Sequence, residues 1–201
     1  MIVVQAAESY PDLSLVEAIK FYREGADVQR CHTIRTIGEY SVGHHSFNIL
    51  AMLRLLKPNA DVPIEVIYAI IDHDIPERLT GDIPAPTKWS GLVDRGALNL
   101  FEDLLISKIA GKSYEHSVLP TLDDGKWLPW IRGLDILELY LFTLDQIAMG
   151  NKIVDKMRIR IDQYIISAKS KYPEEVLDLY FKIKNSNWDH MPDLGDHDGG
   201  Q

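Results

Sequence analysis

Cysteine is almost absent from this sequence: Cys31 is the only one among 201 residues, so no disulfide can form within the chain. A chain without disulfides suits a reducing compartment. No apolar run approaches the roughly 20 residues that a membrane-spanning helix needs. The first residues, MIVVQAAESYPDL, lack the basic start of a signal peptide. These absences favour a cytoplasmic protein that does not enter a membrane.

Positive charge is also scarce. Lys and Arg together number 21 against 30 Asp and Glu, which gives a net charge of -9 and an isoelectric point near 5.2. A nucleic-acid polymer requires a basic face on its partner, so the composition argues against such a partner. A small anionic substrate is still allowed, because one local site can be basic on an acidic protein.

Most of the remaining pattern predicts helices. With 46% hydrophobic and 25% charged residues, we expect one domain over 1–185 and a mobile tail over 186–201. Apolar residues recur at helical spacing and no useful strand alternation occurs, so we expect an all-α bundle of about seven or eight helices. The predicted helices cover 12–24 (ended by Gly25), 41–56 (capped by Ser41), 63–79, 89–109, 130–149, 152–169 and 173–184. Between them we expect an irregular segment over 26–40, a stiff turn over 81–86 and a loop over 120–125.

Four potential metal ligands lie on three predicted helices whose faces are otherwise apolar: His45, His73, Asp74 and Asp135. Imidazole and carboxylate donors together suit a divalent ion such as Co, Mn, Mg, Zn or Fe. An ion at such a place would offset the cost of burying the carboxylates. Considered alone, each histidine is more often a hydrogen-bonded core residue than a ligand. The combination and order of the four residues favour a metal site.

Three stretches carry a family resemblance. "HDIPERLTGDIPAPTKW" is similar to a motif of HD, then E, then TGD-x-P-x-P-x-K and an aromatic residue. "RCHTIRTIGEYSVGHHS" is similar to an R…V-x-x-HS segment, and "DILELY" to a D-x-x-x-x-Y helix. Together, over residues 28 to 150, they resemble the HD-domain phosphohydrolase superfamily with its H…HD…D signature. The resemblance is closest to the 5'-deoxynucleotidase branch, to which phage dATP triphosphohydrolases are similar.

The resemblance implies a helical HD-domain fold, a homodimer or higher homo-oligomer, and a role for each motif residue. The implied metal ligands are His45, His73, Asp74 and Asp135, and Asp74 would also hold the attacking water in line. Glu77 would handle a proton, and Arg30 would hold phosphate with help from Lys88. Asp82 would face the sugar, and Cys31 and His32 would line the substrate pocket beside Arg30.

Two positions depart from the family pattern. Cys31 stands where the branch has a Trp that shapes the sugar and base pocket, so base selectivity does not transfer; we interpret Cys31 as a pocket wall. His44 stands where the branch has Glu, and we interpret it as a surface residue or one behind the ligands. On the Asp135 helix, we interpret Glu138 and Asp145 as structural or exposed rather than catalytic.

The resemblance predicts a metal-dependent hydrolase of 2'-deoxynucleotides, and two reactions fit it. Residues 28–45 contain five Arg or His residues and one acid, Glu39. Because a triphosphate needs a longer basic track than a monophosphate, we favour hydrolysis of dNTP, with dATP first, to deoxynucleoside and triphosphate. The alternative is a 5'-deoxynucleotidase that converts dNMP to deoxynucleoside and phosphate. A third interpretation, of another class, is a non-catalytic nucleotide-sensing protein.

Overall fold

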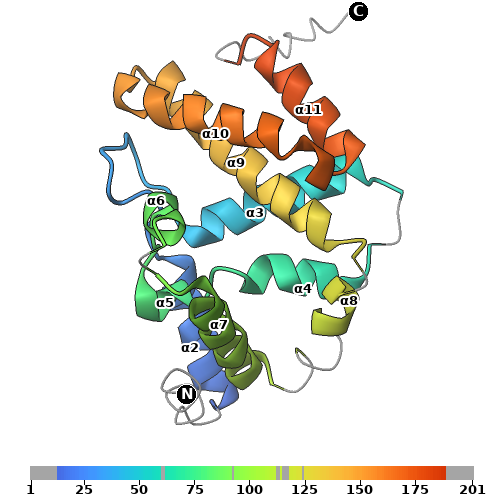
Figure 1. Cartoon of the computed structure of the whole chain (residues 1–201). Coiled ribbons are helices and arrows are strands. Elements are labelled where there is room, and N and C mark those ends of the chain that lie inside the picture. Colours follow the sequence, from blue (N-terminus) through green and yellow to red (C-terminus); the bar gives the residue numbers. More distant parts are fainter. Residues whose placement is uncertain are drawn as a thin grey trace, which may run out of the picture.

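The computed structural model describes residues 13–59, 62–91, 93–111, 114, 118–123 and 125–188. Within this part of the chain every regular element is helical, and β pairing is limited to an isolated bridge between Gln29 and Ser41. The predicted all-α fold class is therefore confirmed (Figure 1). None of the described helices is long and apolar enough to span a membrane.

The elements follow one another along the chain as a series of α-helices and two short 3-10 turns. They are α2 (Leu15–Ala26), α3 (Val42–Leu56), α4 (Ile64–Asp72), α5 (Glu77–Thr80), α6 (Ala85–Trp89), α7 (Arg95–Ala110), α8 (Leu119–Asp123), α9 (Leu128–Ala148), η2 (Lys152–Val154), α10 (Asp155–Ser167), η3 (Lys169–Lys171) and α11 (Glu174–Lys184).

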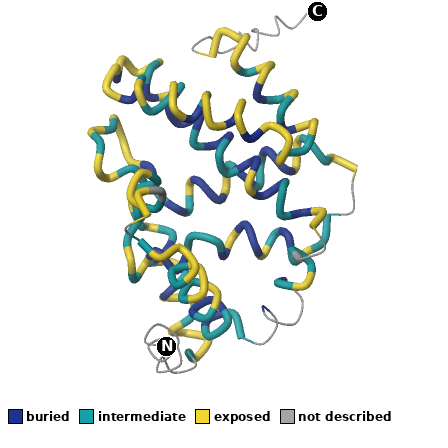
Figure 2. Tube along the Cα trace, viewed as in Figure 1, coloured by how far each residue is buried: buried dark blue, intermediate teal, exposed yellow. Residues whose placement is uncertain are grey.

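The long helix α9 lies at the centre of the bundle. It packs against α3, α10 and α11, and α3 in turn contacts α2 and α4 (Figure 1). Figure 2 shows the buried residues gathered on α3, α4 and α9. Ile49 of α3 and Leu134 and Leu137 of α9 are at most 1% exposed. Burial of each such side chain contributes roughly 1.5–3 kcal/mol, so these helices form a firm frame for the polar residues that they carry.

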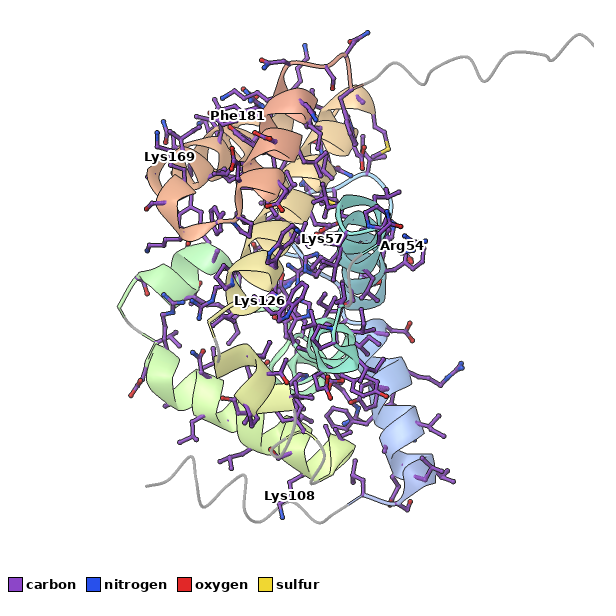
Figure 3. All side chains as sticks on the ribbon, turned by 90° about the vertical axis from the view of Figure 1, so that its right-hand side faces the viewer. Arg54, Lys57, Lys108, Lys126, Lys169 and Phe181 are labelled. Atoms are coloured by element: carbon purple, nitrogen blue, oxygen red, sulfur yellow. The ribbon has the colours of Figure 1, made fainter. Side chains whose placement is uncertain are left out.

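Helix α3 is held at both ends. At its start Ser41 Oγ accepts a hydrogen bond from the backbone N–H of His44 at 3.3 Å, which confirms the predicted cap. At its end Lys57 (Figure 3) lies 4.4 Å from the centre of the Trp130 ring on α9. Lys57 Nζ also lies 2.6 Å from Glu175 Oε1 on α11. These contacts fix α3 against α9 and α11.

Helix α2 differs from the expected 12–24. It begins at Leu15, after a capping box in which Ser14 and Glu17 bond to each other's backbone N–H groups. Gly25 does not end this helix; it is buried within it. A Cβ atom at Gly25 would lie 2.9 Å from the Ile75 carbonyl oxygen, so the glycine permits α2 to approach the chain just after α4.

The helix expected over 63–79 is interrupted. Helix α4 ends at Asp72, a turn follows, and the short α5 begins at Glu77. Pro76 has no N–H to donate to the Asp72 carbonyl, and that oxygen instead accepts from the Ile75 N–H at 3.1 Å. The expectation of one continuous helix was therefore wrong, and His73 and Asp74 lie in the turn.

Four further expectations were wrong in part. The stiff turn over 81–86 runs into the short helix α6, whose first turn accepts Pro86 because N–H groups there need no partner within the helix. Helix α7 begins at Arg95 instead of at residue 89, after Gly91 in a left-handed conformation (φ 74°) and a cap from Asp94. Part of the loop over 120–125 belongs to α8, and the helix over 152–169 is divided into η2, α10 and η3.

Most of the tail predicted over 186–201 lies outside the described residues, namely 189–201. Its described beginning is attached to the bundle, because the indole N–H of Trp188 donates to Asp145 Oδ1 on α9 at 2.7 Å.

Candidate metal centre

The segment before α3 brings Arg30 to the bundle. The backbone N–H of Arg30 donates to the Tyr40 carbonyl at 2.7 Å, and the N–H of Val42 donates to the Val28 carbonyl at 2.9 Å. These bonds close residues 31–40 into a loop whose two ends lie together beside the start of α3. The guanidinium of Arg30 forms an ion pair with Asp74 and lies 3.9 Å from Asp135 Oδ1.

His45 lies at the meeting point of α3, α9 and the turn after α4. Its side chain is fully buried. Its Nε2 atom is 3.1 Å from Asp135 Oδ1, 3.4 Å from His73 Nε2 and 3.7 Å from Asp74 Oδ2. A single imidazole nitrogen, His45 Nε2, therefore lies within 3.7 Å of all three of the other residues that were predicted as metal ligands.

The turn after α4 aims His73 at the same point. His73 Nδ1 lies 2.8 Å from the Ile70 carbonyl oxygen, which can only accept, so Nδ1 carries the proton. The other ring nitrogen, Nε2, then faces Asp74 Oδ2, 3.3 Å away, and His45. Just before this turn, buried Asp72 accepts a hydrogen bond from Tyr22 of α2 at 2.7 Å. The end of α4 is thus tied to α2.

Three of the predicted ligands form a group that could hold a metal ion. Each of His45, His73 and Asp135 offers one ligand atom, and these atoms lie within 4.8 Å of one another. Burial alone would raise the pKa of Asp74, but the charges of His73 and Arg30 keep that pKa well below its usual value. Burial likewise opposes ionisation of Asp135, whose pKa is lowered by its hydrogen bond with His45. Ionised carboxylates beside imidazole nitrogens are a donor set that suits a divalent ion.

Glu77 is the first residue of α5 and is 3% exposed. Its Oε1 atom lies 3.6 Å from Lys88 Nζ, and its Oε2 atom is buried without a hydrogen-bond partner among the described residues. Burial raises the pKa of Glu77 to about 9, and the negative charge of Asp74 adds to this effect. A buried carboxyl oxygen without a partner is rare and calls for a reason, such as a ligand that it faces.

Asp82 joins the turn after α5 to the loop over 31–40. Its Oδ2 atom accepts a hydrogen bond from the backbone N–H of Cys31 at 2.7 Å and lies 3.9 Å from His32 Nδ1. Cys31 has a left-handed backbone (φ 56°), which is uncommon outside glycine, and this hydrogen bond helps to hold it. Burial raises the pKa of the Cys31 thiol to about 12, which argues against a thiolate nucleophile.

Some basic residues of the motifs stay at the surface. His44 is exposed, in agreement with its interpretation as a surface residue, and Arg35 and Arg95 are also exposed. The cations that lie closest to the His and Asp group are therefore Arg30 and, through Glu77, Lys88.

Sequence reasoning interpreted Glu138 as structural or exposed, and it is structural, but the contacts by which it and other polar residues support the site were missed. Glu138 lies 2.5 Å from His45 Nδ1, and the signal that could have revealed it is its position three residues after Asp135, on the same face of α9. Gln146, 1% exposed, accepts from the Ile37 N–H and donates to the Ile37 carbonyl, each at 2.8 Å. Asn151 donates to the Arg35 carbonyl at 2.9 Å, so the loop over 31–40 is clamped to the end of α9.

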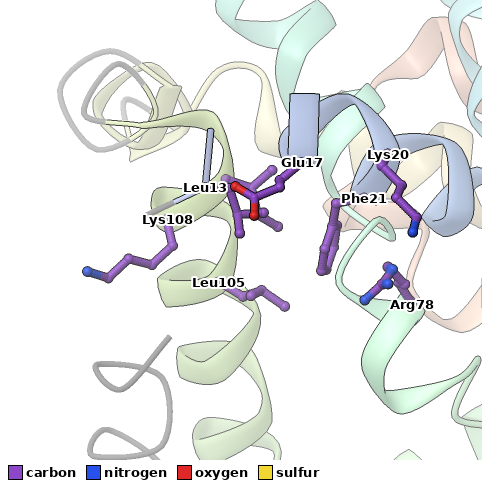
Figure 4. A pocket seen from close by; sticks show the side chains of 8 residues that line it. Leu13, Glu17, Lys20, Phe21, Arg78, Leu105 and Lys108 are labelled. Carbon is purple, nitrogen blue, oxygen red and sulfur yellow. The ribbon is translucent and has the colours of Figure 1, made fainter. Parts of the chain in front are cut away.

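One cavity of about 220 Å³ lies elsewhere, between α2 and α7 (Figure 4). Leu13, Phe21, Leu105 and Ile109 give it apolar walls, and charged side chains such as Arg78 lie at its edge. None of the predicted site residues lines it.

No protein-family model matches this chain, and no curated protein matches it.

Proposed function

We propose that this chain is a metal-dependent phosphohydrolase of the HD-domain type that acts on 2'-deoxynucleotides. The observation that carries the proposal is the group of His45, His73 and Asp135, with ligand atoms within 4.8 Å of one another. Asp74 belongs to this proposal as the fourth ligand, because its Oδ2 atom lies 3.3 Å and 3.7 Å from the Nε2 atoms of the two histidines. The mixture of nitrogen and oxygen donors supports Co, Mn or Zn, with Mg as a further candidate.

The site residues have separate tasks in this reaction. His45, His73, Asp74 and Asp135 would hold a divalent ion, which would supply Lewis-acid activation of a water and of the phosphoryl oxygen. The guanidinium fork of Arg30 stabilises the charge on the phosphoryl oxygens, which requires that it turn from Asp74 toward the substrate. Glu77 transfers a proton to the leaving sugar oxygen, and Lys88 holds the Glu77 carboxyl in place.

We favour dNTP, with dATP first, as the substrate and intact triphosphate as a product. The support is the loop over 31–40, which continues from Arg30 through His32 and Arg35 and is clamped by Gln146 and Asn151. A fixed loop with basic residues offers contacts to phosphates beyond the one at the sugar. The second candidate is the 5'-deoxynucleotidase reaction on dNMP, favoured by the exposure of Arg35 and by the small number of cations at the ligand group.

Anion-exchange chromatography of reactions with Co²⁺ or Mn²⁺ distinguishes these candidates. Deoxyadenosine and triphosphate from dATP are the expected products, and ATP should react more slowly because we place Asp82 at the sugar. Inert dATP beside rapid release of phosphate from dAMP would select the deoxynucleotidase reaction. A protein that binds metal and nucleotide but releases no product would instead be a nucleotide sensor, and light scattering would test the proposed homodimer or higher homo-oligomer.

A further inference from the structure

The side of His45 that faces away from the candidate ligands is enclosed by one carboxylate. Glu138 of α9 is 2% exposed, and its Oε2 atom lies 2.5 Å from His45 Nδ1. The Tyr40 hydroxyl donates to the same oxygen. Asn48, one turn after His45 on α3, donates to the other oxygen at 3.0 Å. Glu138 therefore accepts three hydrogen bonds although its helix is otherwise largely apolar.

This arrangement determines which nitrogen of His45 carries a proton. A carboxylate that already accepts from Tyr40 and Asn48 can only accept from the imidazole as well, so Nδ1 is the N–H donor. The Nε2 atom, which lies 3.1 Å from Asp135 Oδ1, is then the nitrogen that would give its lone pair to a metal ion, after releasing to solvent the proton that it donates to Asp135 in the metal-free protein. The ring plane is fixed too, because Tyr40 packs edge-on against His45 at 88°.

We propose that Glu138 is a positioning residue that fixes the tautomer and orientation of His45 and thereby sets the affinity of the metal site. The inference rests on the proposed function in that it assumes a metal at His45 Nε2. Glu138 does not touch the substrate in this proposal. Its contribution is preorganisation. The negative charge on the far side of the ring makes Nε2 a stronger electron-pair donor to a metal ion, and the hydrogen bonds that fix Glu138 keep the His45 ring oriented toward the ligand group.

The metal-free protein provides the first test, which is independent of any activity. In wild-type protein labelled with ¹⁵N, a slowly exchanging imidazole proton coupled to His45 Nδ1 is expected. Glu138→Leu should lose this signal, and Glu138→Gln should keep it at a shifted position because an amide oxygen still accepts. A wild-type His45 that carries its only proton on Nε2 would overturn the proposal.

Calorimetric titration with Co²⁺ provides the second test. Glu138→Leu should weaken binding about 10- to 100-fold, and Glu138→Gln should weaken it less. The matched control is Asp145→Asn, which removes an exposed carboxylate two turns further along α9 and should leave the affinity unchanged.

The outcomes of the two tests separate the two proposals. A folded Glu138→Leu variant with wild-type Co²⁺ affinity would overturn the role of Glu138. Where Glu138→Leu does not fold, Glu138→Gln decides: an unmoved Nδ1 proton signal together with unchanged affinity would overturn it as well. Wild-type protein that binds no Co²⁺ would refute the proposed function, while the Nδ1 signal would still decide whether Glu138 fixes the ring.

Discussion

Glu77 combines burial with a carboxyl oxygen that has no partner among the described residues, which suits a group that exchanges a proton with a bound substrate. Because it is not among the proposed ligands, Glu77→Gln should retain bound metal. It should nevertheless lower kcat by about 10²- to 10⁴-fold, the usual range for a positioned proton carrier. Metal analysis checks the bound metal, and steady-state kinetics on the same preparations check kcat. Glu65→Gln, in the first turn of α4, is the control, and a Glu77→Gln enzyme with wild-type kcat would show that Glu77 is structural.

His44, the exposed neighbour of His45, provides a matched control for substitutions of the proposed ligand histidines. His73→Ala should abolish bound Co²⁺ and turnover together, because it removes one of three ligand atoms that lie within 4.8 Å of one another. His44→Ala changes the exposed neighbour of His45 and should preserve both. Elemental analysis after dialysis measures the metal, and circular dichroism verifies that each variant is folded. Full activity of His73→Ala in the presence of a chelator would contradict a metal-dependent reaction.

At the scale of elements, the loop over 31–40 depends on the end of α9. Gln146→Ala removes both hydrogen bonds to the Ile37 backbone and leaves partly buried groups unpaired, which should lower the free energy of unfolding by about 1 kcal/mol. We expect the Ile37 amide to lose its protection from hydrogen exchange and KM for the nucleotide to rise, because Arg30 begins this loop. Gln163→Ala, on the exposed side of α10, is the control. An Ile37 amide that stays as protected as in the wild type would contradict the clamp.

The contact between α10 and α11 has a pH dependence. Burial opposes ionisation of Asp162, but hydrogen bonds from Lys184, at 2.5 Å, and from Tyr180 lower its pKa below the ordinary 3.8. A lowered folded pKa adds stability above the unfolded value, and this stability is lost as pH falls through the folded pKa. Asp162→Asn should therefore cost about 1 kcal/mol at pH 7 and progressively less below pH 3.8. Urea unfolding at several pH values measures this, with exposed Asp178→Asn as the control; a cost that grows toward low pH would contradict it.

The elements also show where sequence reasoning succeeds and where it ends. The cap at Ser41 and the end of α3 at Leu56 could be predicted because both depend on neighbouring residues. The break between α4 and α5 was missed because the apolar pattern continues past Asp72, whereas the missing N–H of Pro76 decides the geometry. Gly25 was misread as a helix end because its reason is the approach of Ile75, fifty positions along the chain, which no local pattern reveals.

At the scale of the whole molecule, the motifs correctly indicated that His45, His73 and Asp135 would come together. The residues behind them could not be predicted in the same way. Glu138 meets Tyr40, His45 and Asn48 only because α3 packs against α9, and a glutamate on a helix lies at the surface far more often than it supports a buried histidine. Motifs thus predicted the groups that would face a ligand, while packing determined the groups that hold them.

The candidate ligands come from three segments that are far apart in the sequence, so an unfolded chain presents no comparable group. Bound metal should therefore stabilise the native state against unfolding, since it binds the native state in strong preference to the unfolded one. At a free ion concentration 100 times Kd, this linkage adds about 2.7 kcal/mol to the free energy of unfolding. Differential scanning fluorimetry should show a melting temperature that climbs with the logarithm of ion concentration and falls back with chelator. A melting temperature indifferent to every divalent ion would mean that the three segments meet for another reason.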